Sequence, residues 1–141
     1  SMSYTVAQLL NRAARRLRIV PAGDTLDAED LADALSAYNS MMFGFEAAGL
    51  TLTDSADAAY THATQASTDA FPLADKHFDS VLGVLLERLI GQFPVDQSTA
   101  QGAGNEITTG WSRMYGAFLV VDEANVQDMG VLQSQRDRFW G

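Results

Sequence analysis

The sequence predicts an all-α protein, a bundle of four or five helices with a long central loop, and three observations support this. Apolar residues recur in steps of three and four through most of the 141 positions, which is the spacing of one buried helical face. Residues that favour helix caps stand just before these segments. Hydrophobic residues make up 47% of the chain, which is enough for one buried core.

The first helix is expected to begin near Thr5 and to end by Pro21 and Gly23. Thr5 and Gln8 have the spacing of a capping box. The apolar face consists of Val6, Leu9, Leu10, Ala13, Leu17 and Val20. Four arginines lie elsewhere on the helix, mostly in its C-terminal half, where positive charge complements the helix dipole. They are Arg12, Arg15, Arg16 and Arg18.

The second helix is expected to start after Asp27, a favourable N-cap residue, and to end at Gly49. Acidic residues follow the cap, where negative charge is favoured. The predicted buried stripe consists of Leu31, Leu35, Tyr38, Met42 and Phe45, with Ala34, Met41 and Ala48 beside it. Gly44 lies inside this helix and indicates a close crossing with another helix.

Residues 50–74 change in character, since they are rich in Ser, Thr, Asp and Ala and lack a helical stripe. We expect a long loop or a short, loose β-hairpin that starts with the β-like residues 50–53. Tyr60 and Phe71 are the expected anchors of this segment. Loops of this length inside a compact domain are usually functional or mobile.

The third helix is expected to run from about Asp75 to Phe93 and, being apolar on more than one side, to be the most buried one. A fourth helix, capped by Ser98, is expected to run to about Val121. Gly102, Gly104 and Gly110 interrupt this segment and disfavour a regular helix in its first half.

We therefore expect a helical domain over residues 2–121 and a C-terminal tail or arm over residues 122–141. The apolar residues of the tail could form a short fifth helix or an extended arm, and they are Val126, Met129, Val131 and Leu132. The tail ends with Arg136, Arg138, Phe139 and Trp140. Exposure of the Phe-Trp pair to water is unfavourable, since burying each ring would remove more than ~100 Å² of largely apolar surface from water. The tail is thus a candidate partner-binding segment.

Composition excludes several classes of function. The formal net charge of −9 argues against a protein that holds nucleic acid by its phosphates. There are no cysteines, so disulfides and thiolate metal sites are excluded. No apolar run approaches the ~20 residues needed to cross a bilayer. The four arginines of the first helix could be a solvated basic face, a subunit or partner contact or, least favoured, a nucleic-acid site.

The sequence predicts no catalytic residue, no metal site and no cofactor. His62 and His77 lack partners at metal-ligand spacing, because Asp75 and Asp79 lie two positions from His77 and point away from it on a helix. No serine stands in a G-x-S-x-G elbow, and no phosphate-binding loop is present. The acidic residues between 24 and 33 lack the spacing of a calcium loop.

One family resemblance bears on function. The Pro-Ala-Gly-Asp-Thr-Leu turn at 21–26, the acidic cap and the segment Leu-Ala-Asp-Ala-Leu-x-x-Tyr-Asn-x-Met-Met at 31–42 form one pattern. A Phe-Pro lead-in at 71–72 then precedes a very apolar helix. This pattern resembles the head-to-tail connector proteins of tailed bacteriophages and prophages, also called head-completion or tail accessory factors. The resemblance covers roughly residues 4–95 and does not extend beyond Pro94.

The resemblance implies a structural virion protein rather than an enzyme. It implies a helical adaptor that forms a homo-oligomeric ring, commonly of about twelve subunits, below the portal protein. The ring extends the DNA channel, lets DNA pass without specific binding and receives a downstream tail protein. The location implied is the virion neck, after assembly in the bacterial cytoplasm, and the tail residues 136–140 would dock on the portal. The alternative is a small bacterial helical domain that binds or regulates another protein.

Overall fold

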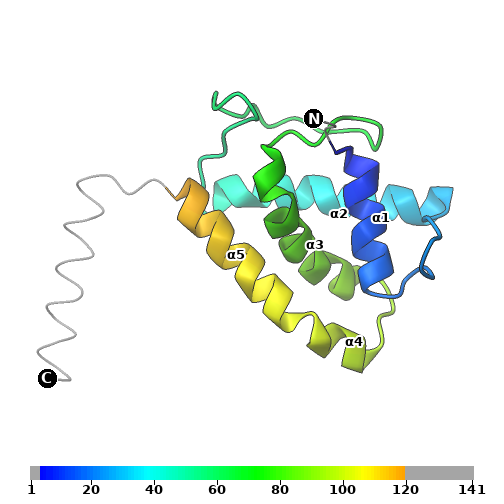
Figure 1. Cartoon of the computed structure of the whole chain (residues 1–141). Coiled ribbons are helices and arrows are strands. Elements are labelled where there is room, and N and C mark those ends of the chain that lie inside the picture. The colour runs from blue at the N-terminus through cyan, green and yellow to red at the C-terminus, as the bar shows by residue number, and fades with distance from the viewer. Residues whose placement is uncertain (1–3, 120–141) are drawn as a thin grey trace, which may run out of the picture.

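The computed structural model describes residues 4–119, which are predominantly helical, as predicted, and contain no β-strand. Helix α3 lies at the centre, and α1, α2 and α5 pack around it (Figure 1). The elements are α1 (Val6–Arg16), α2 (Ala28–Ala47), the 3₁₀ turn η1 (Asp75–His77), α3 (Phe78–Gln92), α4 (Gln97–Gly102) and α5 (Gly104–Phe118). The central position of α3 agrees with its apolar sequence, because most of its residues are buried.

Helix α1 begins as predicted and ends earlier than predicted. Thr5 and Gln8 form the expected capping box. The helix stops at Arg16, because Arg18 adopts a left-handed backbone conformation with φ of 58° and the chain turns there. The N–H of Ile19 closes this turn by donating to the carbonyl of Ala14. Such a C-terminal turn satisfies carbonyl groups that the helix leaves free.

Helix α2 has both predicted ends. The carboxylate of Asp27 accepts the N–H of Asp30, and Gly49 follows the helix with φ of 88°. The crossing expected at Gly44 involves a side chain, since a Cβ there would lie 2.9 Å from a guanidinium nitrogen of Arg88. The glycine therefore makes room for an arginine of α3.

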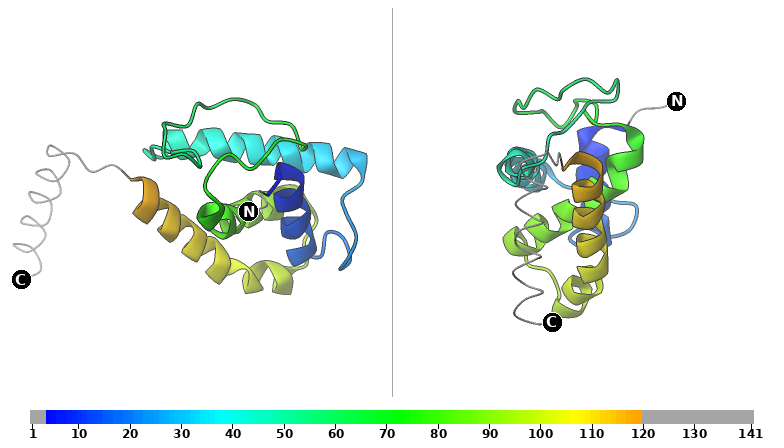
Figure 2. Two further views of the ribbon diagram at one scale, coloured as in Figure 1. Left: turned by 45° about the horizontal axis from the view of Figure 1, so that its top comes forward. Right: turned by 90° about the vertical axis from the view of Figure 1, so that its left-hand side faces the viewer.

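The segment 50–74 is a loop that runs from the end of α2 to η1 and passes over α2 (Figure 2). It forms no strand and only isolated β-bridges, one of them between Thr53 and Ala59. Phe71 is buried and Tyr60 is half-buried, so both serve as the expected anchors. Backbone carbonyls of Ser67 and Asp69 accept N–H groups from the first turn of α1, so the loop also caps that helix.

The predicted fourth helix is two helices. The break falls at Ala103, between Gly102 and Gly104, and separates α4 from α5. Ser98 does not cap α4, because the helix begins after Asp96 and the Ser98 hydroxyl donates to the Asp96 carboxylate. The helix also ends earlier than the expected end near Val121, because α5 stops at Phe118 and Leu119 after it has an extended backbone.

Gly110 does not interrupt α5 and instead marks its closest contact with α3. A Cβ at Gly110 would lie 2.6 Å from the carbonyl oxygen of Ser80, and one at Gly83 would meet the backbone of Glu106. The two glycines face one another, with the Cα of each 3.2–3.4 Å from the ideal Cβ of the other. Two backbones can approach this closely only where both residues lack side chains.

Candidate functional site

The arginines of α1 are the first predicted interaction residues that the structure describes. The guanidinium carbon of Arg12 lies 5.1 Å from the ring centre of Tyr4 and 5.3 Å from that of Phe78. Arg12 is exposed, and its charge rests on aromatic faces, which is a favourable cation–π geometry. Arg15 donates to the carbonyl of Asp24 and so holds the turn between α1 and α2.

Arg16 and Arg18 differ in their surroundings. Arg16 forms an ion pair with Glu106 of α5 at 2.7 Å and donates to the carbonyl of Gly102. It thereby ties α1 to the break between α4 and α5. Arg18 is exposed in the turn after α1. The four arginines thus do not form one cluster, and three of them contact groups of their own chain.

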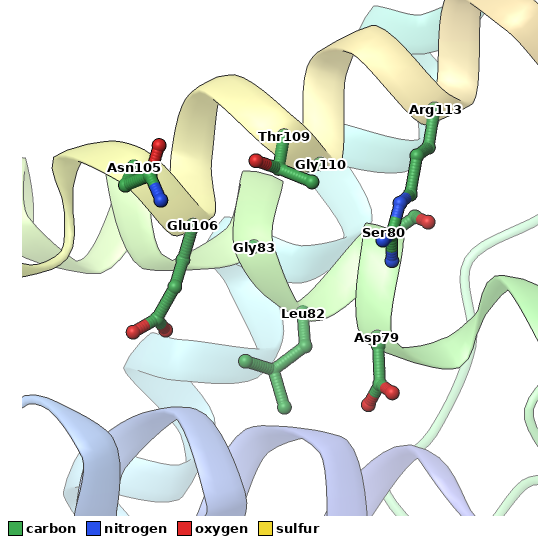
Figure 3. A pocket seen from close by; sticks show the side chains of 9 residues that line it. All are labelled: Asp79, Ser80, Leu82, Gly83, Asn105, Glu106, Thr109, Gly110 and Arg113. Carbon is green, nitrogen blue, oxygen red and sulfur yellow. The ribbon is translucent and has the colours of Figure 1, made fainter.

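A groove with several polar and charged side chains lies between α3 and α5 at the glycine crossing, since Gly83 and Gly110 are among its lining residues. Its cavity volume is about 300 Å³. In Figure 3 the side chains of Asp79, Leu82 and Glu106 extend from α3 and α5 toward α1, whereas Arg113 extends from α5 toward Ser80. The other residues that line it are Gly83, Asn105, Thr109 and Gly110. The sequence did not point to this groove, because its residues come from two helices that are distant in the chain.

The loop 50–74 is fixed to α2 by a short polar motif. The side-chain amide of Asn39 donates to the carbonyl of Gln65 and accepts its N–H, at 3.0 and 2.9 Å. The neighbouring Tyr38 hydroxyl donates to the Gln65 side chain. Burial raises the pKa of Tyr38, with smaller contributions from Tyr60 and Asp69. The phenol therefore stays neutral and remains a hydrogen-bond donor.

Both histidines pack against aromatic rings. His62, in the loop, lies 4.8 Å from the ring of Tyr60 and 5.6 Å from that of Phe43. His77 lies 4.6 Å from the ring of Phe118, and burial together with Lys76 lowers its pKa. Among residues 4–119 no three His, Asp or Glu side chains are grouped as metal ligands.

Exposed apolar side chains occur at the end of the molecule where α5 finishes. Tyr115 is 39% exposed and Leu119 is 47% exposed. Trp111, one helical turn before Tyr115, has its ring centre 5.8 Å from that of Tyr115, and its indole N–H donates to Glu87 at 3.3 Å. We call Trp111, Tyr115 and Leu119 the α5 strip.

The predicted partner-binding residues of the tail lie outside the described residues. They are Arg136, Arg138, Phe139 and Trp140. The placement of these residues and of the predicted boundary at 121–122 therefore stays a prediction.

Comparison with known proteins gives no family for this chain. No protein-family model matches the sequence, and no curated protein matches it significantly. Within residues 4–119, no helix combines the length and the apolar character that a bilayer crossing requires.

Proposed function

We propose that this protein is a structural virion component, a head-to-tail adaptor of a tailed bacteriophage or prophage. In this proposal it assembles as a ring under the portal protein, extends the DNA channel and receives the tail. The proposal rests on the segment at 31–42. Its sequence resembles the connector pattern, and several of its residues pack in the core. Tyr38, Met41 and Met42 are buried, and Asn39 binds the long loop.

The charge of the chain fits a channel through which DNA moves. With a net charge of −9, a ring of copies would repel passing phosphates, so translocation would meet little adhesion. In the proposed assembly, Arg136, Arg138, Phe139 and Trp140 contact the portal. Arg12 and Arg18, the exposed arginines of the first helix and the turn that follows it, are available for contacts between subunits.

The experiment compares the full chain with a deletion of residues 122–141, each mixed with the portal protein encoded beside it. We expect the full chain to sediment with the portal and to add a ring of density under it in electron micrographs. The deletion variant should keep its helical circular dichroism and lose portal binding. A full chain that does not associate with the portal would overturn the proposal.

The second candidate is a small bacterial helical domain that binds or regulates another protein. The α5 strip favours it, since the exposed apolar side chains of Tyr115 and Leu119 at the end of α5 suit a protein partner. The genes beside this one separate the two candidates. Portal, capsid and tail genes are expected for an adaptor, and their absence favours the regulatory domain.

A further inference from the structure

A second groove lies between α2 and α3, with a cavity volume of about 320 Å³. Hydrogen bonds cross it at two places, from Arg88 to the hydroxyl of Ser40 and from the Gln92 amide to the carbonyl of Asp33, each at 3.2 Å. Among the described residues that line it, only Arg88 is charged. We call it the α2–α3 groove, and its lining residues are Ser36, Ala37, Ser40, Arg88, Gly91 and Gln92.

The guanidinium of Arg88 is held in a defined place against α2. One terminal nitrogen donates to the Ser40 hydroxyl. The other lies 2.9 Å from where a Cβ of residue 44 would be, so it uses the space that Gly44 leaves open. Glycine inside a helix lowers the stability of the helix relative to alanine. Here the glycine gives the arginine side chain room to lie along α2.

The charge of Arg88 has no counter-ion within the described part of the chain. Among residues 4–119 it forms no ion pair, although the sequence holds 18 acidic residues and only 9 Lys and Arg. The Ser40 hydroxyl is a neutral partner and uses one of the five N–H donors of the guanidinium. The groove between α3 and α5 differs in this respect, because Asp79 and Glu106 line it together with Arg113.

A partial negative charge opposes Arg88 at the end of α3. Gly91 and Gln92 belong to the last turn of this helix, and a helix C-terminus carries about half a negative charge. The guanidinium carries a full positive charge, so the groove keeps a net positive charge. Its planar fork of N–H groups fits the two oxygens of a carboxylate or of a phosphate group.

We propose that the α2–α3 groove binds an oxyanion, a phosphate or carboxylate group, through Arg88. The guanidinium donates two hydrogen bonds to the anion, and the hydroxyl of Ser36, one helical turn before Ser40, donates a third. In a groove open to solvent, such bonds give a dissociation constant on the order of millimolar. The site does not rest on the proposed function, because it concerns the free chain.

Titration of the isotope-labelled full chain with inorganic phosphate, at constant ionic strength, tests the site. We expect the backbone amide resonances of residues 36–40 and 91–92 to shift and to saturate at millimolar phosphate. A parallel titration with acetate distinguishes the two oxyanions. Tighter binding of phosphate assigns a phosphate ligand, whereas equal or tighter binding of acetate assigns a carboxylate, such as an acidic side chain of a partner protein.

Two variants test the role of Arg88. Arg88→Gln should weaken phosphate binding by about tenfold or more, and the matched control Arg113→Gln, which removes the same charge from the other groove, should leave it unchanged. Gly44→Ala keeps the arginine but displaces its guanidinium, so we expect binding weakened by about threefold. Its control is Gly116→Ala, whose Cβ would meet nothing within 4 Å.

Circular dichroism of each variant shows that the domain stays folded, so that a loss of binding can be assigned to the groove. Shifts that grow linearly with both anions and never saturate would overturn the inference. It would also be overturned if Arg88→Gln bound phosphate as tightly as the unsubstituted chain, or if Arg113→Gln lost binding to the same extent as Arg88→Gln.

Discussion

The close crossing of α3 and α5 is the packing feature of the fold that a single substitution tests most sharply. Gly110→Ala would place a methyl group 2.6 Å from the carbonyl oxygen of Ser80 and 3.1 Å from the backbone nitrogen of Val84. Ordinary contact begins at 3.4 Å, so the helices must separate by about 0.8 Å. Backbone atoms cannot rotate away as a side chain can, and the separation loosens every contact between the two helices.

We estimate the loss from the two opposing effects. Overpacking of this kind lowers the free energy of unfolding by about 3 kcal/mol. Alanine raises it by about 1 kcal/mol, because its helix propensity is higher than that of glycine. The net loss is about 2 kcal/mol, which lowers the melting temperature of a domain of this size by about 8 °C. Thermal unfolding followed by circular dichroism measures this change.

Gly116→Ala is the matched control, since it makes the same change in the same helix. A Cβ at Gly116 would meet nothing within 4 Å. We therefore expect a gain of up to about 1 kcal/mol from helix propensity alone. The two variants should differ by about 3 kcal/mol, with opposite signs. Equal melting temperatures for the two variants would refute the close crossing.

Three further predictions concern single contacts. Asn39→Ala should lower the free energy of unfolding by about 1–3 kcal/mol, because the backbone N–H and carbonyl of Gln65 both lose their partner. Protease should then cleave the loop 50–74 faster. Unchanged cleavage would count against the role of Asn39 in fixing this loop. A double-mutant cycle of Arg16→Ala and Glu106→Ala should give a coupling energy of about 0.5 kcal/mol that weakens in about 1 M salt. This small value is expected because the two side chains are 36% and 43% exposed. A coupling energy that does not change with salt would contradict this prediction. Because the pKa of His77 is lowered from 6.5 in the folded state, the unfolded chain binds the proton more tightly. The free energy of unfolding should thus fall as pH drops below about 6.5. Urea titrations should show a smaller fall for His77→Gln than for the unsubstituted protein. An equal fall in both proteins would refute the contribution of His77.

Local signals in the sequence predicted the helix starts best. Thr5 and Asp27 cap their helices through bonds to residues three positions away, and such spacing is visible in the sequence. Gly49 ends α2 for an equally local reason, its positive φ. The end of α1 was missed because Arg18 takes a left-handed conformation, which non-glycine residues seldom adopt and which no motif announced.

The features that depend on distant residues could not be predicted. Gly110 was interpreted as an interruption because glycine lowers helix propensity, and only the approach of Gly83 from α3 gives it a packing role. The groove between α3 and α5 has the same origin. The pairing of Asn39 with Gln65 crosses 26 positions and that of Arg16 with Glu106 crosses 90. No periodicity or spacing encodes such contacts.

The central proposal is that this chain joins heads to tails, and the most direct measurement is complementation in a prophage-carrying host from which the gene has been removed. The gene is inactivated, the prophage is induced and the particles are counted by electron microscopy. The account predicts DNA-filled or leaky heads and separate tails, which join into infectious virions when the purified protein is added. Complete tailed virions formed in its absence would contradict the account.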